Sequence, residues 1–223
     1  MPDHPRSHPS EVSKPLILIG GSFDPIHLGH LWMADQVQYQ MPNADIRFLP
    51  TAGSPFKPQQ SSIKHRLTQL KLALRDTPYT IERSELFRTA PTYTIDTIRL
   101  IRQRIGWSRP MIFLIGQDSL ESLHRWKEYD QILHYTHLWV FPRASECKPL
   151  QISDELHHYQ SNTAKPLKNS PHGLIYLAPT APPAISSTQI RQQFSHARLL
   201  VPKRVWAYNK KSLLYGNSFS HES

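Results

Sequence analysis

The sequence predicts an α/β fold in which a doubly wound, mostly parallel sheet carries helices on both faces. Short apolar runs alternate with stretches of helical periodicity along most of the 223 residues, as in chains built from right-handed β-α-β crossovers. Two of these runs, at 16–20 and 111–116, are continuously apolar and end in glycine, which is typical of strands buried on both faces. Polar segments follow the runs, at the sheet edge where such folds bind ligands.

The predicted strands are short runs rich in aliphatic and aromatic residues. They lie at 16–20, 45–50, 79–83, 111–116, 137–141 and 174–178. The predicted helices repeat apolar residues every three or four positions or begin at a polar residue or proline. They lie at 31–41, 63–74 and 95–105, in the stretch after "GQDS", and at 186–194 and 202–211.

These elements are expected to form a single domain over residues 15–215, between an arm at 1–14 and a tail at 216–223. The arm is rich in Pro, Ser and His and lacks an apolar segment, so we expect it to be disordered and not a secretory signal. Residues 142–173 show no clear periodicity. We expect an irregular excursion there, with a short helix around 151–160.

The composition limits the classes of ligand and the cellular compartment that we expect. The excess of 26 Lys and Arg over 17 Asp and Glu gives a net charge of +9, which favours anionic ligands. The basic residues are dispersed and not interleaved with aromatic ones, so nucleic acid is not a predicted partner. The single cysteine, Cys147, excludes an internal disulfide framework and a Cys-rich zinc site. One cysteine also suits a reducing compartment, so we expect a cytoplasmic protein. No apolar run approaches the roughly 20 residues that span a bilayer, so we expect no membrane partner.

The stretch "GGSFDPIHLGH" at 20–30 joins the first predicted strand to the first predicted helix. Its two glycines let the backbone approach a ligand closely, and the N–H groups of a helix start attract an anion. A phosphate is therefore the expected ligand at Gly20, Gly21, Ser22 and Phe23. The stretch matches neither G-x-G-x-x-G nor the phosphate loop that ends in Gly-Lys-Ser/Thr, which disfavours ordinary dinucleotide dehydrogenases and the common NTPases.

His27 and His30 stand three residues apart in the first turn of that helix, so both rings can face the same side. A metal site is one alternative, but it needs a third and usually a fourth ligand, and no second His/Cys cluster with ligand spacing appears. Two polar helix-cap residues are the plainer alternative. The other polar segments expected at the same edge, "PTAGSPFK", "GQDS" and "ISSTQIR", favour phosphate binding.

Two motifs together resemble a known superfamily. "GGSFDPIHLGH" is similar to the H-x-G-H signature of the nucleotidyltransferases, and "ISSTQIR" at 185–191 is similar to their second signature, in the same order. "PTYTIDTIR", "FLIGQDSL" and "RWKEYDQIL" are similar to segments of the bacterial nicotinate-nucleotide adenylyltransferases. The match runs from about residue 16 to residue 215 and implies a Rossmann-like domain.

The resemblance implies transfer of AMP from ATP to nicotinate mononucleotide, which gives the deamido dinucleotide and pyrophosphate on the route to NAD. Mg²⁺ is the implied cofactor, bridging phosphates and water. By this resemblance His27 and His30 hold the ATP phosphates, while Arg191 clamps the departing pyrophosphate with help from Ser187 and Thr188.

Further site residues follow from the resemblance. Lys57 is implied as a phosphate ligand, although Phe56 stands where many relatives have His. Asp118 is implied as the acceptor of ribose hydroxyls.

The acceptor site also follows from the resemblance. Trp126 resembles the tryptophan that stacks on the pyridine ring, although "SLHR" before it departs from the usual Phe-Pro-Thr. Thr94 resembles the residue that meets the nicotinate carboxylate. Backbone N–H groups near Tyr93 and Thr94 would favour the acid over the amide, since a carboxylate only accepts hydrogen bonds.

Alternatives remain beside this interpretation. Another adenylyl- or cytidylyltransferase, acting on phosphopantetheine or FMN, shares the H-x-G-H signature, but "TYTIDT" and "GQDS" followed by "RW" argue against it. A non-catalytic nucleotide sensor and a basic module that binds RNA come from other classes. His27, His30 and Arg191 favour turnover, and the missing aromatic and basic stacking motifs argue against RNA.

Overall fold

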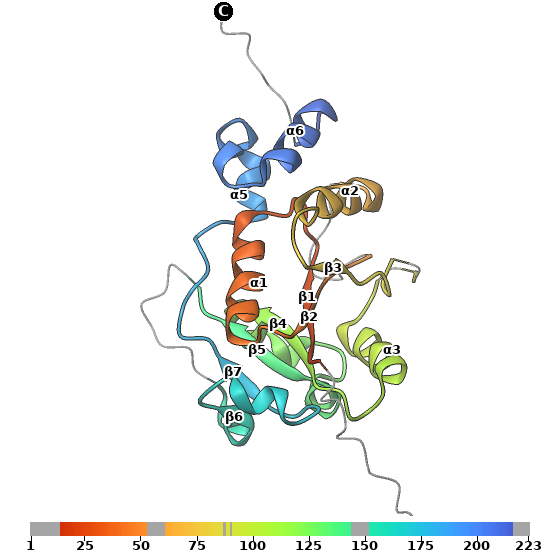
Figure 1. Cartoon of the computed structure of the whole chain (residues 1–223), viewed down its shortest axis with the longest axis vertical. Coiled ribbons are helices and arrows are strands. Elements are labelled where there is room, and N and C mark those ends of the chain that lie inside the picture. Colours follow the sequence, from red (N-terminus) through yellow and green to blue (C-terminus); the bar gives the residue numbers. More distant parts are fainter. Residues whose placement is uncertain (1–13, 53–60, 87, 90, 144–151, 216–223) are drawn as a thin grey trace, which may run out of the picture.

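The computed structural model describes residues 14–52, 61–86, 88–89, 91–143 and 152–215 (Figure 1). The strands, in chain order, are β1 (Leu16–Gly21), β2 (Asp45–Pro50), β3 (Thr80–Ile81), β4 (Met111–Gly116), β5 (His137–Phe141), β6 (Gln160–Ser161) and β7 (Ile175–Leu177). The α-helices are α1 (Leu28–Gln40), α2 (Ile63–Ala73), α3 (Thr94–Ile105), α4 (Gln117–Glu121), α5 (Ser187–Gln192) and α6 (Lys203–Lys211). Short 3₁₀ helices cover Leu123–Arg125, Tyr129–His134, Asp154–Tyr159, Lys165–Lys168 and Phe194–Leu199.

The described strands form one seven-stranded sheet in the order β3-β2-β1-β4-β5-β7-β6, and every pair in it is parallel. From β1 the chain adds β2 and β3 on one side, and it then crosses to β4 on the other side of β1, where β5, β7 and β6 follow, so the strand order reverses between β1 and β4. In open α/β sheets the crevice at such a reversal is the usual ligand site. The predicted doubly wound, mostly parallel α/β fold is confirmed.

The two faces of the sheet have separate apolar cores, which explains why β1 is apolar at every position. Ile17 and Ile19 belong to the core shared with α1, α2, α5 and α6. Leu16 and Leu18 point to the opposite face and belong to the core shared with α3. Figure 1 shows α1 and α3 on opposite sides of the strands. Successive residues of a strand alternate between faces, so only a run without polar positions can be buried on both.

Local signals set the ends of the helices. The side chain of Ser62 caps α2 by accepting a hydrogen bond from the N–H of His65. Pro42 follows the end of α1, and Gly106, at φ 83°, ends α3. These ends fall close to the boundaries expected from the periodicity.

The excursion at 142–173 contains more regular structure than its sequence indicates. In its described part, β6 pairs in parallel with β7, and a 3₁₀ helix (Asp154–Tyr159) lies where a short helix was expected. The two residues of β6 carry no apolar pattern, because this strand lies at the end of the sheet and is mostly solvated. The helix expected after "GQDS" is only the five residues of α4 before the chain tightens into a 3₁₀ turn.

Of the predicted arm at 1–14, only Lys14 lies within the described residues, and the tail at 216–223 lies outside them. Over the same described part of the chain, no helix has both the length and the apolar character that crossing a bilayer requires.

Candidate functional site

The loop after β1 lies at the point where the strand order reverses. A methyl group on Gly20 would lie 2.7 Å from Cζ of Phe113, so glycine lets the ring from β4 close against the end of β1. Phe23 adopts a left-handed φ of 50°, and its buried ring meets the ring of His30 edge to face with centres 5.0 Å apart. The sequence predicts a phosphate contact at Phe23, and burial of the ring leaves only its main chain for that contact.

His27 and His30 form one stacked pair. Their ring centres lie 3.7 Å apart with the planes inclined by 26°, and the N–H of His27 donates to Nδ1 of His30 at 3.3 Å. Gly29 leaves room for the His27 ring, because a methyl group there would lie 3.1 Å from its Nδ1. The helix start therefore fixes both rings, as the three-residue spacing predicts.

Both histidines are neutral at neutral pH. Burial lowers the pKa of the His27 imidazole to about 4. Burial and the neighbouring His27 ring together hold the pKa of His30 well below its usual value. Since Nδ1 of His30 accepts a backbone hydrogen bond, the proton of the neutral ring sits on Nε2, which can donate to an anion.

The second signature docks onto the first. Nη1 of Arg191 donates to the main-chain oxygen of Asp24 at 2.7 Å, and Oγ of Ser187 donates to that of Pro25 at 2.9 Å. Nη2 of Arg191 reaches Oγ1 of Thr188 at 3.3 Å, while its buried Nε has no hydrogen-bond partner among the described residues. Two motifs more than 150 residues apart are thus joined directly at the end of β1.

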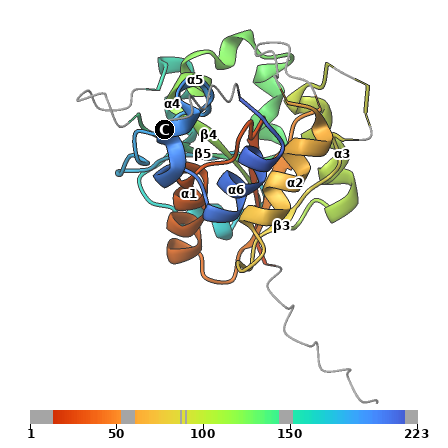
Figure 2. The same ribbon diagram turned by 90° about the horizontal axis from the view of Figure 1, so that it is seen from above.

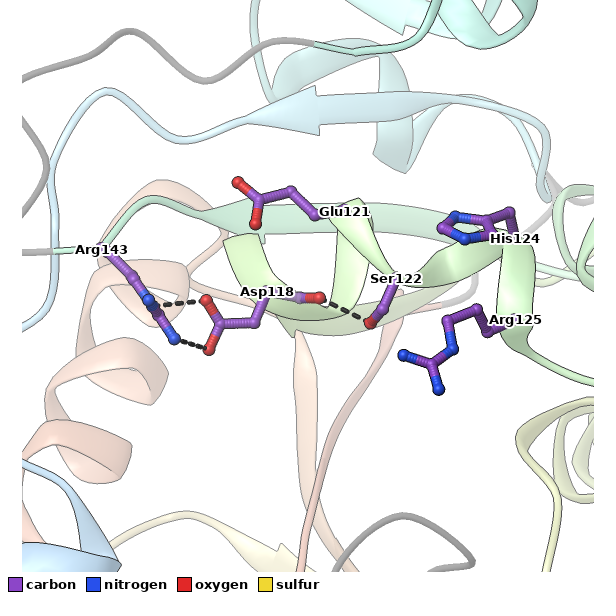
Figure 3. A pocket seen from close by; sticks show the side chains of 6 residues that line it. All are labelled: Asp118, Glu121, Ser122, His124, Arg125 and Arg143. Carbon is purple, nitrogen blue, oxygen red and sulfur yellow. Dashed lines mark hydrogen bonds and ion pairs between the residues drawn. The ribbon is translucent and has the colours of Figure 1, made fainter.

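Asp118 lies on α4, after β4, as predicted. Its carboxylate forms an ion pair with the guanidinium of Arg143, and both side chains are about half-exposed (Figure 3). The two residues line a shallow cavity of about 370 Å³ that also includes Glu121, Ser122, His124 and Arg125. No motif in the sequence singles out Arg143, because its position beside Asp118 depends on the pairing of β4 with β5.

The predicted nicotinate residues lie around the start of α3. Thr94 is its first residue and Tyr93 precedes it without a side-chain cap. Tyr93 and Trp126 are half-buried and pack against the same apolar cluster. Nζ of Lys127 lies 5.2 Å from the centre of the Tyr93 ring and 3.1 Å from the carboxylate of Asp96. Uncapped N–H groups and aromatic faces together suit a planar ring that carries a carboxylate.

The predicted site residues that the structure describes fall into three groups. His27, His30, Arg191, Ser187 and Thr188 are joined around one loop, Asp118 pairs with Arg143, and Tyr93, Thr94 and Trp126 gather at α3. The main-chain oxygens of Gly21 and Ser22 accept hydrogen bonds from the N–H of Thr51 and the guanidinium of Arg66. The predicted ligand Lys57 and its neighbour Phe56 lie outside the described residues, as does Cys147.

The donors of the loop suit a phosphate better than a resident metal ion. Among the described residues, no three His, Cys, Asp or Glu side chains form a group that could hold a metal. Both carboxylate oxygens of Asp24 already accept hydrogen bonds, from the N–H of Ser61 and the hydroxyl of Tyr215. Mg²⁺ prefers oxygen ligands, whereas imidazole N–H and guanidinium groups match phosphate oxygens.

Comparisons with known proteins agree with this arrangement. Residues 18–193 match the cytidylyltransferase-like family. The chain is 35% identical over 211 residues to a protein of Hahella chejuensis named "Probable nicotinate-nucleotide adenylyltransferase". The aligned region covers 91% of this chain and 96% of the relative. A protein of Serratia proteamaculans with the same name is 36% identical over 207 residues, which covers 89% of this chain and 94% of the relative.

A solved structure is similar in fold. Nicotinic acid mononucleotide adenylyltransferase of Plasmodium falciparum, in complex with NaAD, superposes with a TM-score of 0.68 at 18% identity and covers 91% of this chain and 97% of its own. The chain therefore belongs to the cytidylyltransferase-like family and, within it, to the nicotinate-nucleotide adenylyltransferases.

Proposed function

We propose that this protein transfers AMP from ATP to nicotinate mononucleotide and releases the deamido dinucleotide and pyrophosphate. The observation that carries the proposal is the docking of Arg191 and Ser187 onto the loop that holds His27 and His30. This docking gathers donors for the attacked α-phosphate and for the leaving pyrophosphate at one place. The names of the relatives support the same reaction.

The reaction needs positioning more than acid–base chemistry. A phosphate oxygen of nicotinate mononucleotide, already ionised at neutral pH, attacks the α-phosphorus of ATP. The new P–O bond forms as the bond to the bridging oxygen of the β-phosphate breaks, and pyrophosphate leaves with that electron pair. No Ser or Cys nucleophile and no strong base is required. Catalysis then consists of holding two anions in line and stabilising the charge that develops between them.

The loop residues would supply that stabilisation. His27 and His30, held neutral, can donate hydrogen bonds that strengthen as charge grows on the α-phosphate. One nitrogen of the Arg191 guanidinium donates to the main-chain oxygen of Asp24, which fixes the direction of the group. Its other N–H groups would bind the pyrophosphate. Lys57 would add a phosphate contact.

The acceptor nucleotide would bind at α3. Backbone N–H groups around Tyr93 and Thr94 would donate to its carboxylate, and Trp126 would stack on the pyridine ring. Asp118 would accept from the ribose of ATP after Arg143 shifts or shares its carboxylate. An amide acceptor would place an NH₂ group against N–H donors, so we expect the acid to be preferred.

ATP-dependent nucleotidyl transfer generally uses a divalent cation, and we expect Mg²⁺ here, carried on the nucleotide. When bound it would neutralise charge on the phosphates. We further propose that residues 15–215 act as one nucleotidyltransferase domain and that the reaction takes place in the cytoplasm.

The test is pyrophosphate release from ATP with nicotinate mononucleotide, its amide, phosphopantetheine or FMN, in Mg²⁺ or in EDTA. We expect turnover on the acid that requires the cation and falls by about 10²-fold or more in His27→Ala. Tyr39→Ala, an exposed residue at the far end of α1, is the matched control and should keep full activity. Preference for another acceptor would overturn the roles of Thr94 and Trp126, and no turnover with any acceptor would overturn the proposal.

A further inference from the structure

Asp24 joins three distant parts of the chain to the phosphate-binding loop. Its side chain is 2% exposed; Oδ1 accepts from the hydroxyl of Tyr215 at 2.7 Å and Oδ2 accepts from the N–H of Ser61 at 3.1 Å. Its main-chain oxygen accepts from Arg191 at 2.7 Å. The position of Asp24 therefore bears on both the loop of His27 and the clamp of Arg191.

Tyr215 is itself held in a defined direction. Nε2 of Gln69, on α2, donates to the Tyr215 hydroxyl at 2.9 Å and to Oδ1 of Asn209, on α6, at 2.8 Å. Gln69 and Asn209 are fully buried. Because the Tyr215 oxygen accepts from Gln69, its own proton is directed to Asp24. Burial and the Asp24 carboxylate raise the pKa of Tyr215, so the hydroxyl stays protonated.

The turn after α6, which carries Tyr215, has an unusual backbone conformation. Leu213 and Tyr215 adopt left-handed φ values of 51° and 66°, which non-glycine residues rarely do. Such conformations persist where surrounding contacts fix them, and they occur often at functional sites. The turn directs Tyr215 back toward the loop, and Figure 2 shows α6 lying beside α2.

A buried cation, Arg66, also holds the loop in place. Arg66, on α2, is 1% exposed and donates to the main-chain oxygen of Ser22 at 2.8 Å. Burial lowers the pKa of Arg66, and the charge of Asp24 opposes that effect. The loop is thus held on both sides of Phe23, by Arg66 at Ser22 and by the Tyr215 network at Asp24.

We propose that Tyr215 is a positioning residue that acts through Asp24 to hold the loop of His27 and the clamp of Arg191. In this arrangement the turn after α6 supports the loop through Tyr215, without contacting the substrates itself. Its catalytic consequence rests on the proposed adenylyl transfer, whereas the effect on the loop does not.

Tyr208 offers a matched control. Its hydroxyl, also at the α2–α6 contact, bonds Nδ1 of His65 at 2.7 Å. Tyr208→Phe and Tyr215→Phe each remove one hydroxyl that bonds a side chain of α2, but of the two only Tyr215 also bonds the loop. A merely structural role predicts that both variants lose similar thermal stability and keep their kcat.

We expect Tyr215→Phe to lower kcat about tenfold with a change in the KM for ATP below about threefold, and Tyr208→Phe to stay within about twofold. Because Tyr215 acts through Asp24, the double variant Asp24→Asn/Tyr215→Phe should be no slower than Asp24→Asn alone. Equal kcat values for the two Phe variants, or multiplying losses in the double variant, would overturn the inference.

A spectroscopic readout works even if the proposed reaction is wrong. In spectra of protein with ¹³C-labelled histidine rings, the signals of His27 and His30 should shift in Tyr215→Phe and stay in place in Tyr208→Phe. The signal of His65 should do the reverse. Wild-type protein that turns over no acceptor refutes the proposed function alone, whereas unshifted His27 and His30 signals in Tyr215→Phe refute the positioning role.

Discussion

Replacing Gly29 with alanine should separate activity from stability. The added methyl group would lie 3.1 Å from Nδ1 and 3.2 Å from Cε1 of His27, inside the 3.4 Å at which ordinary contact begins. The ring must therefore retreat by about 0.3 Å, and because it stacks on His30 at 3.7 Å, both rings are displaced. We expect kcat to fall about tenfold, which corresponds to about 1.4 kcal/mol of transition-state stabilisation.

The same substitution should not destabilise the protein. Alanine in place of a helical glycine favours the folded state by up to about 1 kcal/mol, which offsets the cost of moving the ring. Steady-state pyrophosphate release gives kcat, and thermal or urea unfolding gives the stability. Tyr39→Ala, on the same helix with a side chain 83% exposed, gains helix propensity without touching either histidine. Wild-type kcat in Gly29→Ala, or a loss of kcat matched by a loss of stability, would refute the reasoning.

Two further substitutions test the buried His137 and the clamp of Arg191. His137 is fully buried, with Nε2 on the carbonyl of Ser170 and Nδ1 accepting from Leu174, and burial lowers its pKa to about 4. The unfolded chain, with a histidine pKa of about 6.5, binds the proton first, so this stabilisation is present above pH 6.5 and is lost as the pH falls toward 4. Between pH 7.5 and pH 5 the free energy of unfolding, measured in urea, should fall by about 2 kcal/mol less in His137→Gln than in the wild type. Equal decreases in the two proteins would contradict the buried neutral ring. Arg191→Lys should lower kcat by about 10²-fold because one ammonium group cannot hold Asp24 and clamp a phosphate together; full activity in steady-state assays would show that charge alone suffices.

The sequence predicts the sheet well because the signal for each strand is local. The strands predicted at 45–50, 111–116 and 137–141 coincide with β2, β4 and β5, and 111–116 is apolar throughout. A strand buried on both faces needs an unbroken apolar run, and neighbouring residues alone record that need. The prediction is weakest at 142–173, because β6 is a short edge strand whose residues face solvent and carry no pattern.

The sequence also predicts only part of the candidate site. The spacing of His27 and His30 and the glycine between them follow from the geometry of one helical turn, and the stacked rings agree with it. Phe23 shows the limit of a motif: its position is in the loop, but its left-handed backbone turns the ring into the core. Residues that a motif places are thus not always residues whose side chains meet a ligand.

Features encoded within a few neighbouring residues can be predicted from the sequence: the buried strands, the amphipathic α3 and the two signatures. How these parts meet depends on contacts between segments that are distant in the sequence. The hydrogen bond between Asp24 and Tyr215 joins residues 191 positions apart, and that between Asp24 and Arg191 joins residues 167 apart. No local pattern records such pairs, because their geometry arises only after the parallel sheet has brought the loops to one edge and α2 and α6 have packed together.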